Sequence, residues 1–543
     1  MNTLFLYLRS EGEIMNTPKN PSWQMKLILA TCALSSSVWG QTHQTIDLKV
    51  FLEEFHSDTK NVMDQIPVKD GHHSLSEKAT VIPVKASIGN SFVEQKDAQR
   101  SQICKLDSIS GVEVCLDSLS GRAGIGGNDR AEVLVDLGER AIKTLGAMDQ
   151  RNLSSAKLSV KPWSDDYWAI AKGVLSYRYA DPNKNNGDWK AHTDYVTEIP
   201  ADTFIESGMI SILSPAEKYD LLIGDANFTL TNKMINEGRY YYESTGKVES
   251  WMGICHGWAP AAYMMDRPTQ LVTVKSVTGL EIPFYPSDIK SLGSLLWANV
   301  KTYTKFSGGR CNSKDPKKDS DSGRIQDQEC FDTNPGSWHK SVVNQIGISD
   351  RSFIIDATYD YEVWNQPVYS YSYKYFNPEN YETSQDDYTK VAIDISDFKK
   401  DKFKKYRSPK TKQIVGVEMR VEYIAETEPT HRSFDNDSYD YVTGVTYRYD
   451  LELDGRGTII GGEWYSNKHP DFLWTPPKNT RALTDLDKQI ISAIGNGRRD
   501  LEWGENDDLP AIWATNAPKA SKEGEPLGLI VEGLIKRSRA QSN

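Results

Sequence analysis

The spacing of hydrophobic residues predicts two β-hairpins in the second half of the chain. Apolar residues lie on both sides of Thr278-Gly279, between residues 271 and 284, and this dipeptide is typical of a tight turn. From residue 441 to residue 464, hydrophobic positions alternate with polar ones on either side of Asp454-Gly455. Such alternation is typical of strands with one buried face. We therefore expect antiparallel strands to dominate this half.

Helical spacing is clearest from Ile289 to Tyr303, where apolar residues recur at helical intervals after Ser287-Asp288, the expected cap. A weaker helical pattern runs from Ala131 to Met148. Because a few helices accompany many strands, the predicted fold class is α+β, with helices packed on an antiparallel sheet.

The first forty residues follow the order of a secretory signal peptide. Met25-Lys26 precedes the short apolar run from Leu27 to Leu34, and small residues then lead to an expected cleavage after Gly40. A start at Met15 or at Met25 leaves this pattern intact. The alternative is an ordinary buried strand. We expect residues 1–40 to be removed and the mature protein to be secreted, to the extracellular space or to the periplasm of a Gram-negative cell.

Aromatic residues divide the chain. Residues 41–150 contain only Phe51, Phe55 and Phe92 as aromatic residues, whereas 26 of the 27 Tyr and 12 of the 14 Trp follow Lys161. A change of composition on this scale indicates a domain boundary. We expect an aromatic-poor pro-segment or amino-terminal domain at 41–155, a main domain at 156–480 and a carboxyl-terminal extension at 481–543.

The charge balance argues against a general nucleic-acid-binding protein. The chain has 63 Lys and Arg against 75 Asp and Glu, a formal net charge of −12, and phosphate binding needs a basic face. No Cys-x-x-Cys or His-Glu-x-x-His motif indicates a metal site. The acidic loop Asp319–Gly323 has its glycine too early for a calcium-binding loop and lacks the final Glu. The sequence requires no cofactor and offers no support for activation by calcium.

Cysteine spacing singles out one thiol. Of six cysteines, Cys32 lies in the signal segment, which leaves five in the mature chain. Two pairs are close in sequence, so we expect the disulfides Cys104–Cys115 and Cys311–Cys330 in an oxidising compartment. Cys255 is left over, and an unpaired thiol in a secreted protein is buried, paired between chains or used in chemistry.

The leftover Cys255 lies at the expected start of a helix. Gly253 suits a tight entry turn, and one helical face collects the apolar residues Ile254, Trp258, Ala261, Ala262 and Met265. Backbone N–H groups and the helix dipole at a first turn favour the thiolate, which makes the sulfur a nucleophile at neutral pH. The alternative is a buried structural cysteine.

A nucleophilic cysteine needs a base, and we expect His339 to supply it. His256 is the sequence neighbour of Cys255, but adjacent side chains on a helix point about 100° apart. If the chain turns back between Gly347 and Ile348, His339 and Asp356 face each other across a hairpin, with Cβ atoms about 5 Å apart. The carboxylate would then hold the imidazole while its other nitrogen reaches the thiol.

One segment resembles a known protein family. The run Val363-Trp364-Asn365-Gln366-Pro367-Val368, preceded by Tyr361-Glu362, is similar to the start of the elicitor peptide of the transglutaminase elicitor family, which comprises oomycete cell-wall transglutaminases and bacterial relatives. The resemblance covers about residues 160–480 and includes the segment from Trp251 to Trp258. After Val368 the family peptide continues Arg-Gly-Phe-Lys, whereas this chain alternates Tyr with Ser and Lys.

The resemblance implies a papain-like, transglutaminase-type core, with a Cys-bearing helix packed on a sheet that carries His and Asp. It assigns catalysis to Cys255, His339 and Asp356. The thiolate would attack a glutamine carboxamide, His339 would protonate the departing ammonia, and a lysine amine would turn the thioester into an isopeptide crosslink between proteins.

Several further expectations depend on this chemistry. Water competes with the lysine amine, so we expect an aromatic acyl channel formed by Trp251, Trp258, Trp338 and Trp364. An uncovered thiolate would crosslink proteins during export, so residues 41–155 are expected to act as an inhibitory zymogen segment. The partners would be glutamine-donor and lysine-acceptor proteins, with contact to a cell wall or host surface. Two alternatives remain: a secreted cysteine peptidase or amidase, and a non-catalytic wall-binding or elicitor protein.

Overall fold

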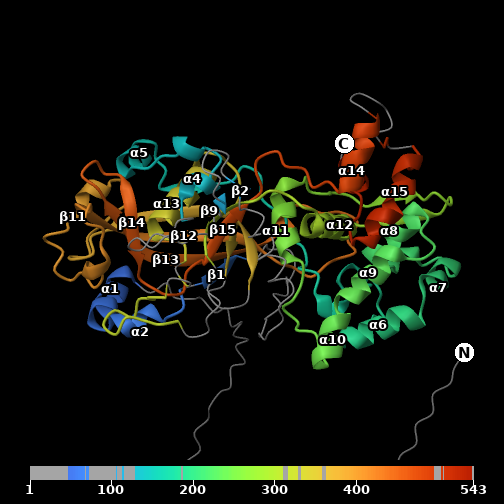
Figure 1. The fold of residues 1–543 in the computed structure, drawn as a ribbon, viewed down its shortest axis with the longest axis horizontal. Coiled ribbons are helices and arrows are strands. Elements are labelled where there is room, and N and C mark those ends of the chain that lie inside the picture. The colour runs from blue at the N-terminus through green and yellow to red at the C-terminus, as the bar shows by residue number, and fades with distance from the viewer. Residues whose placement is uncertain are drawn as a thin grey trace, which may run out of the picture. The chain divides into compact units, whose positions relative to one another are not determined.

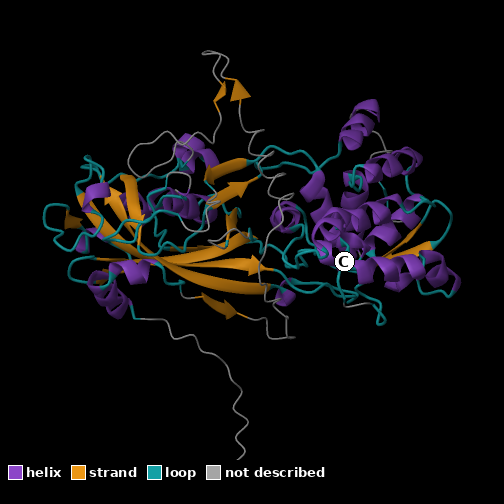
Figure 2. Cartoon of the chain, turned by 60° about the horizontal axis from the view of Figure 1, so that its bottom comes forward, coloured by secondary structure: helices purple, strands orange, loops and turns teal. Residues whose placement is uncertain are grey.

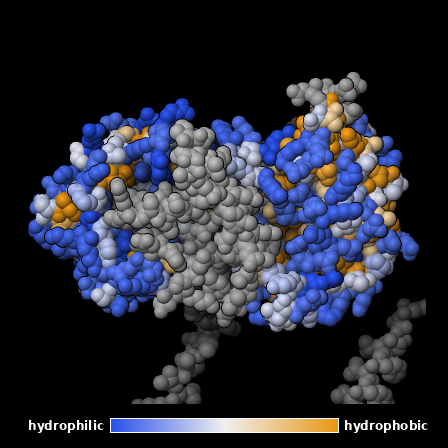
Figure 3. Space-filling model, viewed as in Figure 1, coloured by the Kyte–Doolittle hydropathy of each residue, from blue (hydrophilic) through white to orange (hydrophobic). Residues whose placement is uncertain are grey.

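The structure is a computed structural model. It describes residues 47–67, 69–72, 105–106, 113–114, 129–184, 187–309, 316–327, 330, 332–357, 363–494, 503–504 and 507–540. The expected signal peptide at 1–40 lies outside the described residues. Among the described residues, no helix is long and apolar enough to span a bilayer. Among the coloured residues of the face in Figure 3, hydrophilic ones predominate, with hydrophobic ones gathered in the right-hand part.

A curled antiparallel sheet is the largest element of the fold (Figures 1 and 2). Its described strands run in the order β1 (Lys69–His72), β13 (Tyr441–Leu453), β12 (Gln413–Ala425), β9 (Asn365–Phe376), β8 (Ile354–Asp356), β15 (Phe472–Thr475) and β7 (Lys305–Gly308). Four short strands extend it: β4 (Ser155–Lys157) and β10 (Thr383–Ser384) pair with β9, β11 (Ile393–Asp394) with β12, and β14 (Ile459–Trp464) with β13. The hairpin expected between 441 and 464 is thereby confirmed.

The expected hairpin from His339 to Asp356 is wrong, because this stretch begins as helix α13 (Pro335–Gly347). The Asn334 side chain caps the helix by accepting the Gly336 N–H, and Pro335 occupies the first turn. Trp338, Val342, Val343 and Ile346 recur at helical spacing and are all buried. The β-branched pair Val342-Val343 suggested a strand, but burial against the sheet outweighs that local preference.

The main helical part of the chain carries the candidate nucleophile. It comprises α6 (Trp189–Glu198), α7 (Ala201–Glu206), α8 (Pro215–Ile223), α9 (Thr229–Glu237), α10 (Arg239–Thr245), α11 (Cys255–Met264) and α12 (Pro286–Asn299), joined by α14 (Asp485–Ile494), α15 (Ala511–Lys522) and α16 (Gly528–Ala540). The hairpin β5 (Val272–Lys275) to β6 (Glu281–Phe284) is confirmed. The helix expected from Ile289 to Tyr303 is confirmed as α12, although its cap is Tyr285, before the expected Ser287-Asp288, and it ends at Asn299. Because a Cβ at Gly257 would lie 2.1 Å from the Ser294 carbonyl oxygen, only glycine lets α11 approach α12 so closely.

The amino-terminal segment from α1 (Leu48–Ser57) through α2 (Thr59–Met63) to β1 is packed on the sheet. The Phe55 ring stacks on Tyr465 with centroids 4.3 Å apart, and the Arg448 guanidinium lies 4.4 Å from the Phe51 ring centroid. Strand β1 adds to the edge of β13 over four residue pairs. This part of the expected pro-segment therefore packs against the main domain in a smaller hydrophobic cluster beside the main core.

Residues 129–157 also pack into the main core, although the sequence places them before the main domain. The expected helix at 131–148 is divided into α4 (Ala131–Leu134), a short turn and α5 (Leu145–Gln150). The Asp136 carboxylate pairs with Arg351 at 2.6 Å, and the Ile142 N–H donates to the Asn344 side chain at 2.7 Å. A chain beginning at Leu158 would lose these contacts.

The structure describes two of the cysteines of the mature chain, Cys330 and Cys255. Cys330 is disulfide-bonded, whereas Cys255 is buried outside any disulfide. Cys104, Cys115 and Cys311 lie outside the described residues, so both expected pairings stay predictions.

Replacing Phe55 by Ala should lower the free energy of unfolding by about 3 to 5 kcal/mol, because the stacked ring leaves a cavity against Tyr465. Urea unfolding measures this change. Val50→Ala on the same helix is the matched control: Val50 is 55% exposed, so its replacement should change stability by less than about 0.5 kcal/mol. Equal stability of the two variants would show that this helix is a removable leader.

Candidate active site

Cys255 is the first residue of α11, as the sequence predicts. The Ile254 N–H donates to the Tyr167 carbonyl oxygen at 2.7 Å, which anchors the entry to the helix. A Cβ at Gly253 would lie 2.4 Å from the same oxygen, so glycine is needed for this approach. The Cys255 side chain therefore projects from a helix start that two backbone contacts hold in place.

The start of β9 contacts the Cys255 sulfur from two directions. The thiol donates to the Val363 carbonyl oxygen at 3.7 Å, and the Asn365 Nδ2 donates to Sγ at 3.5 Å. The Asn365 Oδ1 accepts a hydrogen bond from Trp474 Nε1 at 2.8 Å. The two features that the sequence singled out, the Cys255 helix and the Val363–Val368 motif, thus meet at one atom.

Asp356 is the candidate carboxylate that the structure brings to this place. It ends β8 directly opposite Asn365 in the ladder, so the two Cβ atoms lie about 5 Å apart on one face. Its side chain is fully buried, and Oδ1 accepts the Trp364 N–H at 2.9 Å. Asp356 is therefore the ladder partner of Asn365, whose side chain contacts the Cys255 sulfur.

His339 lies on helix α13, which packs against another part of the sheet. Its Nδ1 shares a hydrogen bond with the Tyr449 hydroxyl at 2.9 Å, and its ring centroid is 4.8 Å from that of Tyr373. Tyr373 follows Asn365 by eight residues on β9, so at about 3.3 Å per residue the two Cα atoms lie about 26 Å apart along the strand. The neighbourhood of His339 is therefore far from the Asn365 side chain at the thiol. None of the contacts found among the described residues joins His339 to Cys255 or Asp356. Burial and the nearby Lys340 cation lower the pKa of His339 to about 3.

Only one of the four candidate channel tryptophans packs in the cluster around Cys255. Trp364 borders Tyr167, at a ring-centroid distance of 5.6 Å, in a cluster that includes Cys255. Trp258 and Trp338 are completely buried, and Trp251 belongs to the main core. Sequence reasoning missed Tyr167 as a wall of the site. The available signal was its place in the aromatic run Pro162–Trp168, at the start of the stretch that resembles the family.

A buried acidic group lies beside this site. Burial, with the carboxyls of Asp471, Asp356 and Asp129 nearby, raises the pKa of Asp332 well above its usual value. His469 Nδ1 lies 3.7 Å from the Asp332 carboxyl, its ring stacks on Trp464, and burial lowers its pKa to about 3. The structure thus buries His469 against a carboxyl group.

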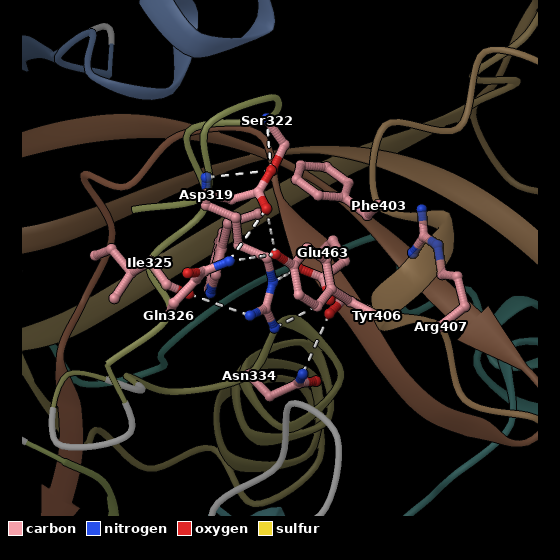
Figure 4. A network of polar contacts seen from close by, with 12 residues as sticks. Asp319, Ser322, Ile325, Gln326, Asn334, Phe403, Tyr406, Arg407 and Glu463 are labelled. Atoms are coloured by element: carbon pink, nitrogen blue, oxygen red, sulfur yellow. Dashed lines mark hydrogen bonds and ion pairs between the residues drawn. The ribbon is translucent and has the colours of Figure 1, made fainter. Parts of the chain in front are cut away.

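The loop that resembles a calcium-binding sequence is occupied by protein donors (Figure 4). Asp319 accepts hydrogen bonds from Ser322 at 2.9 Å, Gln326 at 3.1 Å and the Tyr406 hydroxyl at 2.8 Å, and it pairs with Lys405. These donors lower its pKa in spite of burial. No group of three His, Cys, Asp or Glu suited to a metal ion occurs among the residues that the structure describes.

The buried His339 should make the protein less stable in acid. Its folded pKa of about 3 lies below the usual 6.5, so the unfolded chain binds a proton first and stability is lost as pH falls from 6.5 toward 3. Glutamine can hydrogen-bond Tyr449 but cannot take up this proton. His339→Gln should therefore reduce the slope of unfolding free energy against pH in this window, measured by urea unfolding. An unchanged slope would contradict the burial of His339.

Comparisons with known proteins cover both the Cys255 helix and the Val363–Val368 motif. The family model described as "Transglutaminase elicitor" matches residues 139–490. No curated protein matches the chain. Among solved structures, the GP42 transglutaminase from Phytophthora sojae is similar, with 23% sequence identity, a TM-score of 0.44 and coverage of 66% of this chain and 94% of that chain. Because the family model spans more than half of the sequence, the chain belongs to the transglutaminase elicitor family.

Proposed function

We propose that this protein is a transglutaminase, which forms isopeptide crosslinks between glutamine and lysine side chains of proteins through a thioester on Cys255. The observation that carries the proposal is the contact of the Val363–Val368 motif with the Cys255 sulfur at the start of α11. A thiol at a helix start favours the thiolate, and the buried carboxyl of Asp356, opposite Asn365 in the ladder, is a candidate group for proton transfer.

The reaction begins when the Cys255 thiolate attacks the glutamine carboxamide carbon, and the carbonyl electrons move to oxygen. Proton transfer to the nitrogen releases ammonia and leaves a thioester, which a neutral lysine amine then attacks. We assign the proton transfers to Asp356, because it lies beside Asn365 at the thiol. His339, which the family resemblance implies, is the alternative that the experiment below separates.

Burial of the motif favours a catalytic role over recognition at the surface. Val363 and Gln366 are 7% and 4% exposed, and Asn365 and Val368 are completely buried. A segment in this position is poorly placed to be perceived from outside the folded protein. The aromatic rings of Trp364 and Tyr167 beside the thiol would instead limit the access of water to the thioester.

We also propose that the protein is exported. The basis is the signal-like order of residues 25–40 together with the disulfide at Cys330, a bond that persists in oxidising compartments. The substrates would then be extracellular proteins with accessible glutamine and lysine side chains.

Cys255→Ala should abolish incorporation of a fluorescent amine into a glutamine-rich protein, while the melting temperature stays nearly unchanged. Asp356→Asn should slow the reaction by at least about 10²-fold, the usual scale for losing an acid–base group. His339→Gln should retain activity, because its contacts are with Tyr373 and Tyr449.

Two results would revise this assignment. Loss of activity in His339→Gln together with an active Asp356→Asn would place the proton transfer on His339. Hydrolysis of peptide bonds by the wild type, without amine incorporation, would identify a cysteine peptidase in place of a transglutaminase.

A further inference from the structure

We propose that Asn365 is the side-chain donor that stabilises negative charge at the Cys255 sulfur and at the substrate oxygen, and that Trp474 is the positioning residue that orients its amide. The inference rests on the proposed function for the substrate step. Its first part, the effect on the thiolate, concerns Cys255 alone and can be measured without any substrate.

The orientation of the Asn365 amide follows from the chemistry of its partner. An indole Nε1–H is a donor only, so the atom that faces Trp474 at 2.8 Å is the amide oxygen. The amide nitrogen must then point to the Cys255 sulfur, 3.5 Å away. Rotating the amide would place two donors against each other and an oxygen against the sulfur. The hydrogen bond from Trp474 therefore selects the orientation that favours a thiolate.

Asn365 and the two side chains on the neighbouring strands belong to one sheet. Asn365 lies on β9, Asp356 pairs with it on β8, and Trp474 lies on β15, which pairs with β8. Asn365 and Asp356 are completely buried, and Trp474 is 8% exposed. A donor on such a ladder is held in place before the substrate arrives, which is the condition for efficient electrostatic stabilisation.

The two contacts of Sγ favour opposite protonation states. The Val363 carbonyl oxygen accepts the S–H of the neutral thiol, whereas the Asn365 N–H strengthens its bond when the sulfur is negative. When sulfur attacks the carboxamide carbon, the new C–S bond forms and the carbonyl electron pair moves to oxygen. That oxygen is bound to the carbon next to sulfur, so the Asn365 N–H and the Cys255 backbone N–H can both reach it. On collapse the carbonyl re-forms, the C–N bond breaks and a proton transferred from Asp356 to the nitrogen lets it leave as ammonia.

The test compares two readouts in the full-length protein. The first is the rate of Cys255 alkylation by iodoacetamide as a function of pH, and the second is the rate of amine incorporation. In Asn365→Ala, loss of the donor should move the alkylation midpoint to higher pH and slow incorporation by about 10²- to 10³-fold. Asn365→Asp should move the midpoint further, because a carboxylate repels the thiolate.

Trp474→Phe keeps the aromatic ring but removes the N–H that orients the amide. It should shift the alkylation midpoint in the same direction as Asn365→Ala, by less. Ser372→Ala is the matched control on β9, seven residues beyond Asn365 and outside the Val363–Val368 motif. Its side chain is exposed, so this variant should keep the wild-type midpoint and rate.

The outcomes separate the two proposals. Wild-type midpoints and incorporation rates in both Asn365→Ala and Trp474→Phe would overturn the role of Asn365. If the wild type incorporates no amine but its alkylation midpoint still depends on Asn365, the transglutaminase proposal fails and the thiolate role stands. If Asn365→Ala does not fold, as judged by its melting temperature, the midpoint of Trp474→Phe decides.

Discussion

The contact between the first turn of α11 and the first residues of β9 is the constraint on which the site depends. The backbone on both sides of Cys255 packs so closely, at Gly253 against Tyr167 and at Gly257 against α12, that a Cβ at either glycine would clash. On the other side, the backbone of Asn365 is paired with β8. The thiol is therefore held between a helix and a sheet whose positions are set by different parts of the chain.

The helical side is held by buried charges that satisfy one another. The Lys218 ammonium of α8 lies 2.6 Å from the Asp288 carboxylate of α12, and both side chains are completely buried. The Tyr179 hydroxyl donates to the other oxygen of Asp288 at 2.9 Å. A buried charge is costly unless it is paired, so removing either partner would destabilise the packing of the helices that support α11.

The sheet side is held by α13 and by the amino-terminal segments. The Asp129 carboxyl accepts the Asn334 N–H at the start of α13, and burial raises its pKa to about 7. This contact connects a residue before the expected main domain to the helix that covers the sheet. The amino-terminal residues therefore contribute to the scaffold that positions Asn365 and Asp356, although they lie far from both in sequence.

Local signals in the sequence were sufficient for the elements that depend on neighbouring residues. The turn at Asp454-Gly455, the helix after Pro286 and the position of Cys255 in a first turn follow from spacing and capping within about ten residues. The Val363–Val368 motif identified the family.

Tertiary structure decided what these elements contact. Val342-Val343 became helical because burial against the sheet outweighs strand preference, and this moved His339 to Tyr449. Asn365, over 100 residues from Cys255, meets its sulfur only because β9 pairs with β8 and packs on α11, and no local pattern encodes such long-range burial.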